Sequence, residues 1–202
     1  MSANLLVILD DKKMQRALTR IAHEILERNS GARSLVIIGI LTRGAILAKR
    51  IAASIKELEG VNVPLGFMDI SLYRDDVHSK LEQPIVQRTD ILFEVRDKNV
   101  ILIDDVLYTG RTVRAALDQM VDFGRAKTIQ LAALVDRGHR ELPIKADYVG
   151  ANIPTSQDDR VVVRVTEIDA KDEVLVEKGK AETPVKLESK KTASARKAKG
   201  RK

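Results

Sequence analysis

Two adjacent carboxylates follow an apolar run and precede a turn of small polar residues. Asp104 and Asp105 come after four apolar residues, and the segment 109–112 (TGRT) follows them. Ionised carboxylates only accept hydrogen bonds, so their natural partners are vicinal ribose hydroxyls or a metal ion. Backbone N–H groups of a tight turn that opens a helix bind anions, and Gly110 lets a phosphate come close. The pattern therefore predicts a site for a phosphorylated ribose.

This site needs a strand before it and a helix after it. Residues 100–104 (VILID) predict a buried strand, and residues 111–123 predict a helix that ends at Gly124. In open α/β sheets ligands bind at the carboxyl ends of the strands, where the two carboxylates would lie. The sequence contains neither GxxxxGK[ST] nor GxGxxG, which excludes a Walker A loop and a dinucleotide-binding fingerprint. The flanking strand and helix favour a ligand site over carboxylates that only cap a helix.

Hydrophobic periodicity predicts alternating helices and strands along the rest of the chain. The expected helices are 11–29 and 43–58, and the expected strands are 35–41, 63–70, 128–135, a short one from Tyr148, 161–165 and 174–176. Residues 72–88 are polar, charged and interrupted by Pro84, which predicts a long excursion or a mobile loop. The alternation predicts an α/β fold with a mostly parallel central sheet, and the first helix and last strands are expected outside that sheet.

The positive charge of the chain is concentrated at its C-terminal end. The whole chain carries +6, but residues 178–202 contain ten Lys or Arg against two Glu and account for +8, so residues 1–177 carry −2. We expect residues 1–177 to form one domain and residues 178–202, which have almost no large apolar side chains, to be a disordered basic tail. Nucleic-acid binding by the body must therefore rest on a local patch, because its overall charge is nearly neutral.

Composition and the N-terminal sequence exclude several classes of protein. The chain has no cysteine, which excludes disulfides. Its three histidines are scattered, so a structural zinc site is not expected. The sequence begins MSANLLVILDDKK, with a five-residue apolar run and no basic leader, so no signal peptide is expected. No segment approaches the length of a membrane span. These features predict a cytoplasmic protein that does not enter a membrane.

The segment VILIDDVLYTGRT resembles the phosphoribosyl pyrophosphate (PRPP) signature of the type I phosphoribosyltransferases. Together with LTRGAILAKRIA, DISLYRDD and VDRGHRELPIKADYVGANIPTS, it resembles the bifunctional family of pyrimidine operon attenuation regulators and uracil phosphoribosyltransferases. The likeness runs from about residue 5 to residue 177, and LYTGRTVRA and VDRGHRELP are specific to this branch. It implies a type I phosphoribosyltransferase fold, in which helices flank the central sheet and a small hood is added.

The resemblance also implies an activity, a metal and an assembly. The reaction is the transfer of the phosphoribosyl group from PRPP to uracil, which gives UMP and pyrophosphate. Mg²⁺ would accompany PRPP and contact Asp104 and Asp105 indirectly, through PRPP and water. A homodimer or a higher homo-oligomer is expected.

The resemblance assigns site residues to three segments of the chain and to a lid. The residues expected to bind PRPP are Thr42, Arg43, Gly44, Asp104, Asp105, Thr109, Gly110, Arg111 and Thr112. The residues expected to contact uracil are Asp136, Arg137 and Gly138, with backbone groups among the candidates, and the expected catalytic residues are Asp104, Asp105 and Arg74. A non-proline cis peptide is expected near Leu41–Thr42, and Arg74 would lie in a loop that closes over the site.

The same resemblance implies binding of a leader mRNA hairpin of the pyrimidine operon, promoted by UMP and opposed by PRPP. The residues expected to contact RNA are Thr19, Arg20, Arg28, Arg140 and Lys145. The family commonly has arginine where this chain has Lys145 and lysine where it has Ala151. The alternative is therefore a uracil-salvage enzyme with no role in RNA regulation, while an RNA-binding module that only senses nucleotides is disfavoured by the complete set of PRPP-binding residues.

Overall fold

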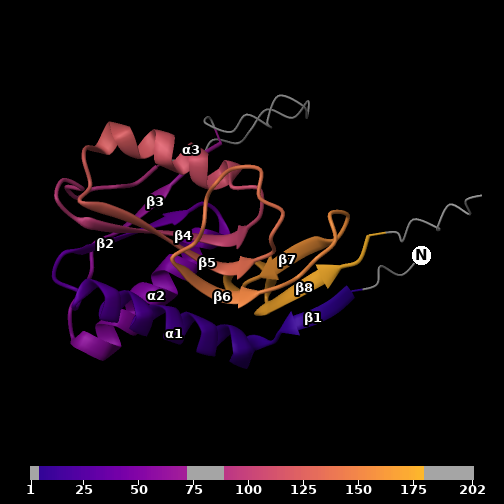
Figure 1. Ribbon diagram of the computed structural model, residues 1–202. Coiled ribbons are helices and arrows are strands. Elements are labelled where there is room, and N and C mark those ends of the chain that lie inside the picture. Colours follow the sequence, from indigo (N-terminus) through magenta and orange to yellow (C-terminus); the bar gives the residue numbers. More distant parts are fainter. Residues whose placement is uncertain (1–4, 72–88, 180–202) are drawn as a thin grey trace, which may run out of the picture.

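The computed structural model describes residues 5–71 and 89–179 (Figure 1). Its helices are α1 (Asp11–Asn29), α2 (Arg43–Glu59), α3 (Arg111–Met120) and the short α4 (Thr166–Asp169), and α3 continues into the 3-10 turn η2 (Val121–Phe123). Its strands are β1 (Leu5–Leu9), β2 (Leu35–Ile40), β3 (Leu65–Met68), β4 (Asn99–Leu107), β5 (Thr128–Asp136), β6 (Tyr148–Asn152), β7 (Arg160–Arg164) and β8 (Glu173–Glu177). The expected loop 72–88 and residues 180–202 of the expected tail lie outside the described residues.

Five parallel strands form the central sheet, in the order β3-β2-β4-β5-β6. The sheet separates two apolar cores, because successive strand residues point to opposite faces. Ile101 and Ile103 of β4 pack with α1 and α2 on one face, whereas Val100 and Leu102 pack with α3 on the other. Figure 1 shows α3 on one side of this sheet and α1 and α2 on the opposite side. Burial on both faces explains why β2, β4 and β5 have continuous apolar runs. The predicted α/β fold is confirmed.

A second, antiparallel sheet of order β1-β8-β7 forms the small hood. β1 was not predicted as a strand, since the sequence shows it only as a short apolar run. It forms because Leu6 pairs with Val176, 170 positions along the chain, and no local pattern reveals such a pairing. The last strands lie outside the parallel sheet, as expected.

The boundaries of the predicted elements agree closely with the structure, and the informative difference lies at the end of β4. α1 begins after Asp10, whose carboxylate accepts from the Lys13 amide at 2.8 Å, and ends at Ser30 in the left-handed region. β4 was expected to end at Asp104 but continues to Leu107, so both candidate carboxylates lie within the strand. None of the described helices is long and apolar enough to cross a membrane.

The body of the protein includes two residues that were assigned to the tail. Lys178 donates from Nζ to the Asp159 carboxylate at 2.8 Å, and the Gly179 amide donates to the same carboxylate at 3.2 Å. The ordered part therefore reaches at least Gly179.

Candidate active site

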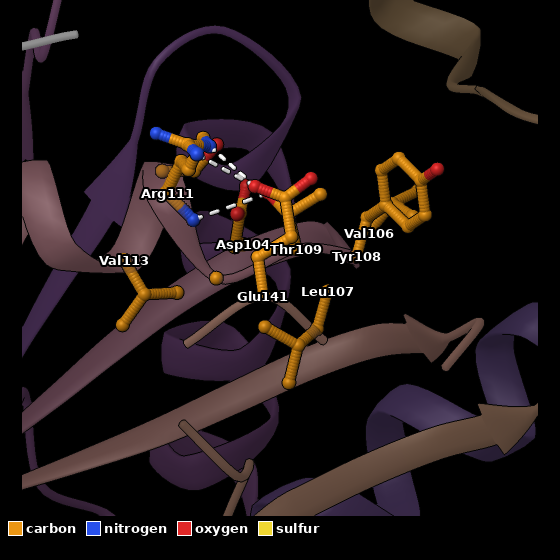
Figure 2. Close-up of a pocket in the computed structure, with 10 residues that line it drawn as sticks. Asp104, Val106, Leu107, Tyr108, Thr109, Arg111, Val113 and Glu141 are labelled. Atoms are coloured by element: carbon orange, nitrogen blue, oxygen red, sulfur yellow. Dashed lines mark hydrogen bonds and ion pairs between the residues drawn. The ribbon is translucent and has the colours of Figure 1, made fainter. Parts of the chain in front are cut away.

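The turn between β4 and α3 surrounds a hollow at the carboxyl edge of the central sheet. We call residues 108–112 the signature loop. Gly110 has φ of +95°, a conformation that favours glycine, and it places the first amides of α3 towards this edge. The hollow is lined by Asp104, Val106, Leu107, Tyr108, Thr109, Gly110, Arg111, Thr112, Val113 and Glu141 (Figure 2). The structure thus brings five of the residues predicted to bind PRPP around one space.

The two carboxylates face different sides of β4. Asp104 is buried and lines the hollow, whereas the positive charge of Arg43 acts on Asp105 from the α2 side. The Asp105 amide donates to the Asp104 carboxylate, and the Val106 amide donates to the Asp105 carboxylate, each at 2.9 Å. Burial raises the pKa of Asp105 above its ordinary value, and the hydrogen bonds from its neighbours and the charge of Arg43 oppose this shift. These acceptors are held rigidly by the strand.

Residues 41–44, which we call the pyrophosphate loop because the resemblance assigns pyrophosphate to it, lie directly beside these carboxylates. The peptide bond between Leu41 and Thr42 is cis, as predicted. Gly44 touches β4 so closely that a Cβ there would lie 2.5 Å from the Ile103 carbonyl oxygen and 3.2 Å from the Asp104 Cα. Only glycine allows this approach, and it places the start of α2 against the end of β4.

Arg43 of this loop is held by the hood. One of its terminal nitrogens donates to both carboxylate oxygens of Asp169, at 2.9 and 3.1 Å. Its Nε is buried and has no hydrogen-bond partner within residues 5–71 and 89–179. A buried donor without a partner is costly, so this nitrogen is available to an anionic ligand.

Residues 136–139, the base loop, follow β5 next to the end of β4. Arg137 is buried, and its guanidinium donates to the Thr155 hydroxyl at 3.2 Å and the Ser156 carbonyl at 3.0 Å. The same guanidinium lies 4.0 Å from the centroid of the Tyr108 ring, which is close enough for a cation–π contact. The Arg137 side chain therefore supports the segment from Thr155, and its expected contact with uracil stays a prediction. Backbone groups of the base loop stay as the candidates for that role.

His139, the last residue of the base loop, makes contacts in the same region. It has φ of +56°, and its Nε2 lies 2.7 Å from the Thr155 carbonyl oxygen. Its ring also contacts Tyr108 edge-on, with 6.2 Å between the centroids. His139 thus helps to hold the base loop against the signature loop.

Comparisons with known proteins agree with this geometry. The phosphoribosyl transferase domain family matches residues 6–171. The bifunctional protein PyrR of Alkaliphilus metalliredigens is 58% identical over 173 residues, which cover 86% of this chain and 95% of the relative. The corresponding protein of Deinococcus radiodurans is 58% identical over 172 residues and 94% of its length. This chain belongs to the PyrR family of phosphoribosyltransferases.

Solved structures support the family's fold independently of close sequence similarity. The hypoxanthine-guanine phosphoribosyltransferase of Bacillus anthracis has a TM-score of 0.65 at 20% identity, and the match covers 88% of this chain and 99% of that one. The hypoxanthine phosphoribosyltransferase of Trypanosoma cruzi has a TM-score of 0.64 at 19% identity, with 86% and 96% covered. At this identity the likeness shows the fold alone, and it confirms the type I phosphoribosyltransferase architecture.

The structure separates the five RNA-contact candidates of the PyrR family into two groups. Arg20 lies on α1 and donates to the β6 carbonyls of Val149 and Gly150, at 3.1 and 2.6 Å. Arg28, also on α1, pairs with Asp147 at 2.7 Å. Both arginine side chains are about half exposed, at 50% and 53%. The remaining candidates on or near this face are Thr19 of α1, whose hydroxyl donates to the Gln15 carbonyl, and the exposed Lys145, which precedes β6.

Arg140 makes its contacts with the base loop and the signature loop and not with α1, and its predicted part in an RNA surface stays a prediction. Its guanidinium is largely buried and donates to the carbonyls of Ile144 and Tyr108, at 2.9 and 2.8 Å. It also binds the Asp136 carboxylate. These contacts tie the base loop to the signature loop.

Arg74, the third expected catalytic residue, lies outside the described residues. Three residues of the site were not predicted. Tyr108 lies inside VILIDDVLYTGRT and Glu141 inside VDRGHRELP, and their place in these recognised motifs was the available signal. Asp169 gave no signal, because it is 126 positions from Arg43.

Proposed function

We propose that this protein transfers the phosphoribosyl group of PRPP to uracil, giving UMP and pyrophosphate, and that it regulates pyrimidine genes by UMP-dependent binding of leader mRNA. The observation that carries the catalytic half is the hollow in which the signature loop meets Asp104. Membership of the PyrR family supports both halves.

Different groups among the described residues are suited to bind the different parts of PRPP. The amides and hydroxyls of Thr109 to Thr112 bind the 5′-phosphate. Asp104 and Asp105 accept hydrogen bonds from the ribose hydroxyls and stabilise the positive charge that develops on the ribose as pyrophosphate leaves. The unpartnered Nε of Arg43 and the amides of the pyrophosphate loop hold the departing group. Backbone groups of the base loop orient uracil for attack at the anomeric carbon.

Mg²⁺ fits this arrangement as a companion of PRPP. Within the described residues, no group of three or more His, Cys, Asp or Glu side chains could hold a metal ion. Mg²⁺ commonly keeps several water ligands and uses one or two carboxylates plus substrate phosphates, a role suited to Asp104 and Asp105. When bound, the ion supplies charge neutralisation on the pyrophosphate oxygens.

Base selectivity tests the catalytic half. With PRPP and Mg²⁺, radiolabelled uracil should be converted to the nucleotide far faster than hypoxanthine, guanine or orotate. A preference for a purine would reject the uracil assignment, even though the fold would stay the same.

The regulatory half rests on a local patch, since the body carries no excess of positive charge. We infer that Arg20, Arg28 and Lys145 contact the hairpin, because they are partly or fully exposed around α1 and the start of β6. The carboxylates Glu24 and Asp147 already pair with the two arginines, so RNA phosphates must compete with them. Because of that competition, the alternative of a uracil-salvage enzyme with no RNA-regulatory role has to be tested.

The test uses protein truncated after Gly179, so that the basic tail cannot supply non-specific affinity. Arg20→Ala and Arg28→Ala should weaken binding to the leader hairpin and lower the salt slope by about one per lost phosphate contact. Lys56→Ala on α2 is the matched control, because it removes one exposed cation from another face. Equal affinity for cognate and scrambled hairpins, with no response to UMP, would leave the salvage enzyme as the function.

We also propose a homo-oligomer of this chain in the cytoplasm. Leu6 and Val7 are each 53% exposed on β1, an edge strand of the hood, and such apolar exposure on an edge favours burial against another copy. Light scattering coupled to size exclusion should give a mass of at least two chains. A single-chain mass at micromolar concentration would reject this assembly.

A further inference from the structure

The carboxylate of Glu141 lies at the hollow that the signature loop surrounds. The Glu141 carboxylate accepts from Arg111 Nε at 2.7 Å and pairs with one of its terminal nitrogens at 2.7 Å. Both residues line the hollow together with Thr109, Gly110 and Thr112. Figure 2 shows the Glu141 side chain reaching from its own loop towards Arg111. The arginine that lines this hollow thus already has an anionic partner from the protein.

The backbone of Glu141 is joined to the signature loop, whereas its carboxylate can leave. The amides of Glu141 and Leu142 both donate to the Thr109 carbonyl, at 3.0 and 3.1 Å. The Glu141 side chain is 52% exposed and the Arg111 side chain 43% exposed, so the pair is open to solvent. Rotation of the side chain therefore breaks its ion pair with Arg111 without breaking the backbone connection.

We propose that Glu141 determines the affinity of this site for 5′-phosphorylated ligands by competing with the phosphate for Arg111. This inference rests on the proposed function, which places a 5′-phosphate in the hollow. A phosphate dianion and the Glu141 carboxylate are both negatively charged and cannot both lie against Arg111 without repulsion. The phosphate must displace the carboxylate, and part of its binding free energy is lost in doing so.

The competition predicts which ligands respond to a change at this position. PRPP and UMP carry the 5′-phosphate and should bind more tightly when the carboxylate is neutralised. Uridine lacks the phosphate, and pyrophosphate binds at the pyrophosphate loop, so neither should respond. A glutamate that only supported the loop would affect all of these ligands together.

The experiment compares Glu141→Gln with the unmodified protein by titration calorimetry. Glutamine keeps the length and a hydrogen-bond acceptor but removes the charge. Because an exposed ion pair contributes little, UMP and PRPP should bind about two- to fivefold more tightly. Affinity for uridine and inhibition by pyrophosphate should stay unchanged.

Asp118→Asn is the matched control. Asp118 lies on α3 and pairs with Arg114 of the same helix at 3.6 Å, with both side chains more than half exposed. It carries the same charge as Glu141 but does not line the hollow. This variant should leave UMP affinity unchanged. If its affinity for UMP rose as much as that of Glu141→Gln, the effect would come from the overall charge of the protein, and the proposal would be rejected.

Two further outcomes are decisive. In an Arg111→Gln background, the gain from Glu141→Gln should disappear, because the contested cation is gone. Unchanged or weaker UMP binding by Glu141→Gln, in a protein whose unmodified form binds UMP, would overturn this inference alone. If the unmodified protein binds neither UMP nor PRPP, the proposed function fails, and this inference fails with it.

Discussion

The guanidinium of Arg140 binds the carboxylate of Asp136, the last residue of β5. The same guanidinium donates to the carbonyls of Leu107 and Tyr108, at 3.3 and 2.8 Å. Hydrogen bonds from Arg140 and the Gly138 amide outweigh the effect of burial, which alone would raise the pKa of Asp136, and hold that pKa below its usual value. One side chain thus fixes the base loop against the end of β4.

This contact predicts that Arg140→Gln damages both catalysis and stability. Loss of the guanidinium leaves several carbonyls and the Asp136 carboxylate without their donor, at a cost of about 1–3 kcal/mol in the free energy of unfolding. We expect kcat/KM for uracil to fall by about tenfold or more, because small displacements of a positioned substrate are costly. Steady-state kinetics and thermal unfolding measure both effects.

Arg114→Gln is the control for this variant, since Arg114 is an exposed arginine of α3 outside the base loop. It should change neither quantity appreciably. An Arg140→Gln protein with normal uracil turnover and weakened hairpin binding would place Arg140 in the RNA surface and contradict the assignment made from its contacts.

The paired carboxylates should be essential for turnover but not for folding. Asp104→Asn and Asp105→Asn each remove a charge that faces the developing positive charge on ribose, so kcat should fall by about one to three orders of magnitude. The amide oxygen of asparagine can still accept from the neighbouring backbone amide, as both carboxylates do now. Circular dichroism should therefore show a folded protein, whereas wild-type turnover in both variants would refute the site.

Gly44→Ala tests the contact between the pyrophosphate loop and β4. Its methyl group would meet the Ile103 carbonyl oxygen at 2.5 Å, so the loop must move away from Asp104. We expect KM for PRPP to rise by about tenfold and stability to fall by about 1–3 kcal/mol. Gly60→Ala serves as the comparison, because a methyl there meets nothing within 4 Å and only its positive φ is strained. An unchanged KM in Gly44→Ala would show that the loop position is unimportant.

The end of the body should be sensitive to pH through Lys178. A hydrogen bond from Lys178 lowers the pKa of Asp159 to about 2, so this contact stabilises the protein above the ordinary aspartate pKa and is lost as the pH falls towards 2. Lys178→Gln should lower the thermal midpoint slightly at pH 7, and the difference should vanish between about pH 4 and pH 2.

Truncation after Gly179 is the complementary test of the tail. The residues beyond it have too few apolar groups to offset the entropy of ordering, so stability and uracil turnover should remain unchanged. A large loss of either property would show that the tail docks on the body.

For the Lys178 prediction, a decrease in the thermal midpoint of Lys178→Gln that is equal at pH 7 and pH 2 would contradict the role of the Asp159 pair.

The sequence by itself determined the fold class and the segment that surrounds the hollow at the carboxyl edge of the sheet. Those features are local, because an apolar run predicts a buried strand and the order DD–TGRT specifies acceptors followed by an anion-binding turn. For the same reason the cis peptide at Leu41–Thr42 followed from a recognised motif. These inferences required no knowledge of which distant residues meet.

Only the tertiary structure decided where the charged side chains point. Arg140 and Arg137 looked like free cations for RNA and uracil, but contacts with Tyr108, Asp136 and residues 155–156 hold their guanidinium groups. The partners Asp169 and Glu141 lie 126 and 30 positions from the arginines that they bind. A guanidinium on a long flexible stem can reach many partners, so its direction depends on which carboxylates and carbonyls the folded chain brings within hydrogen-bond distance.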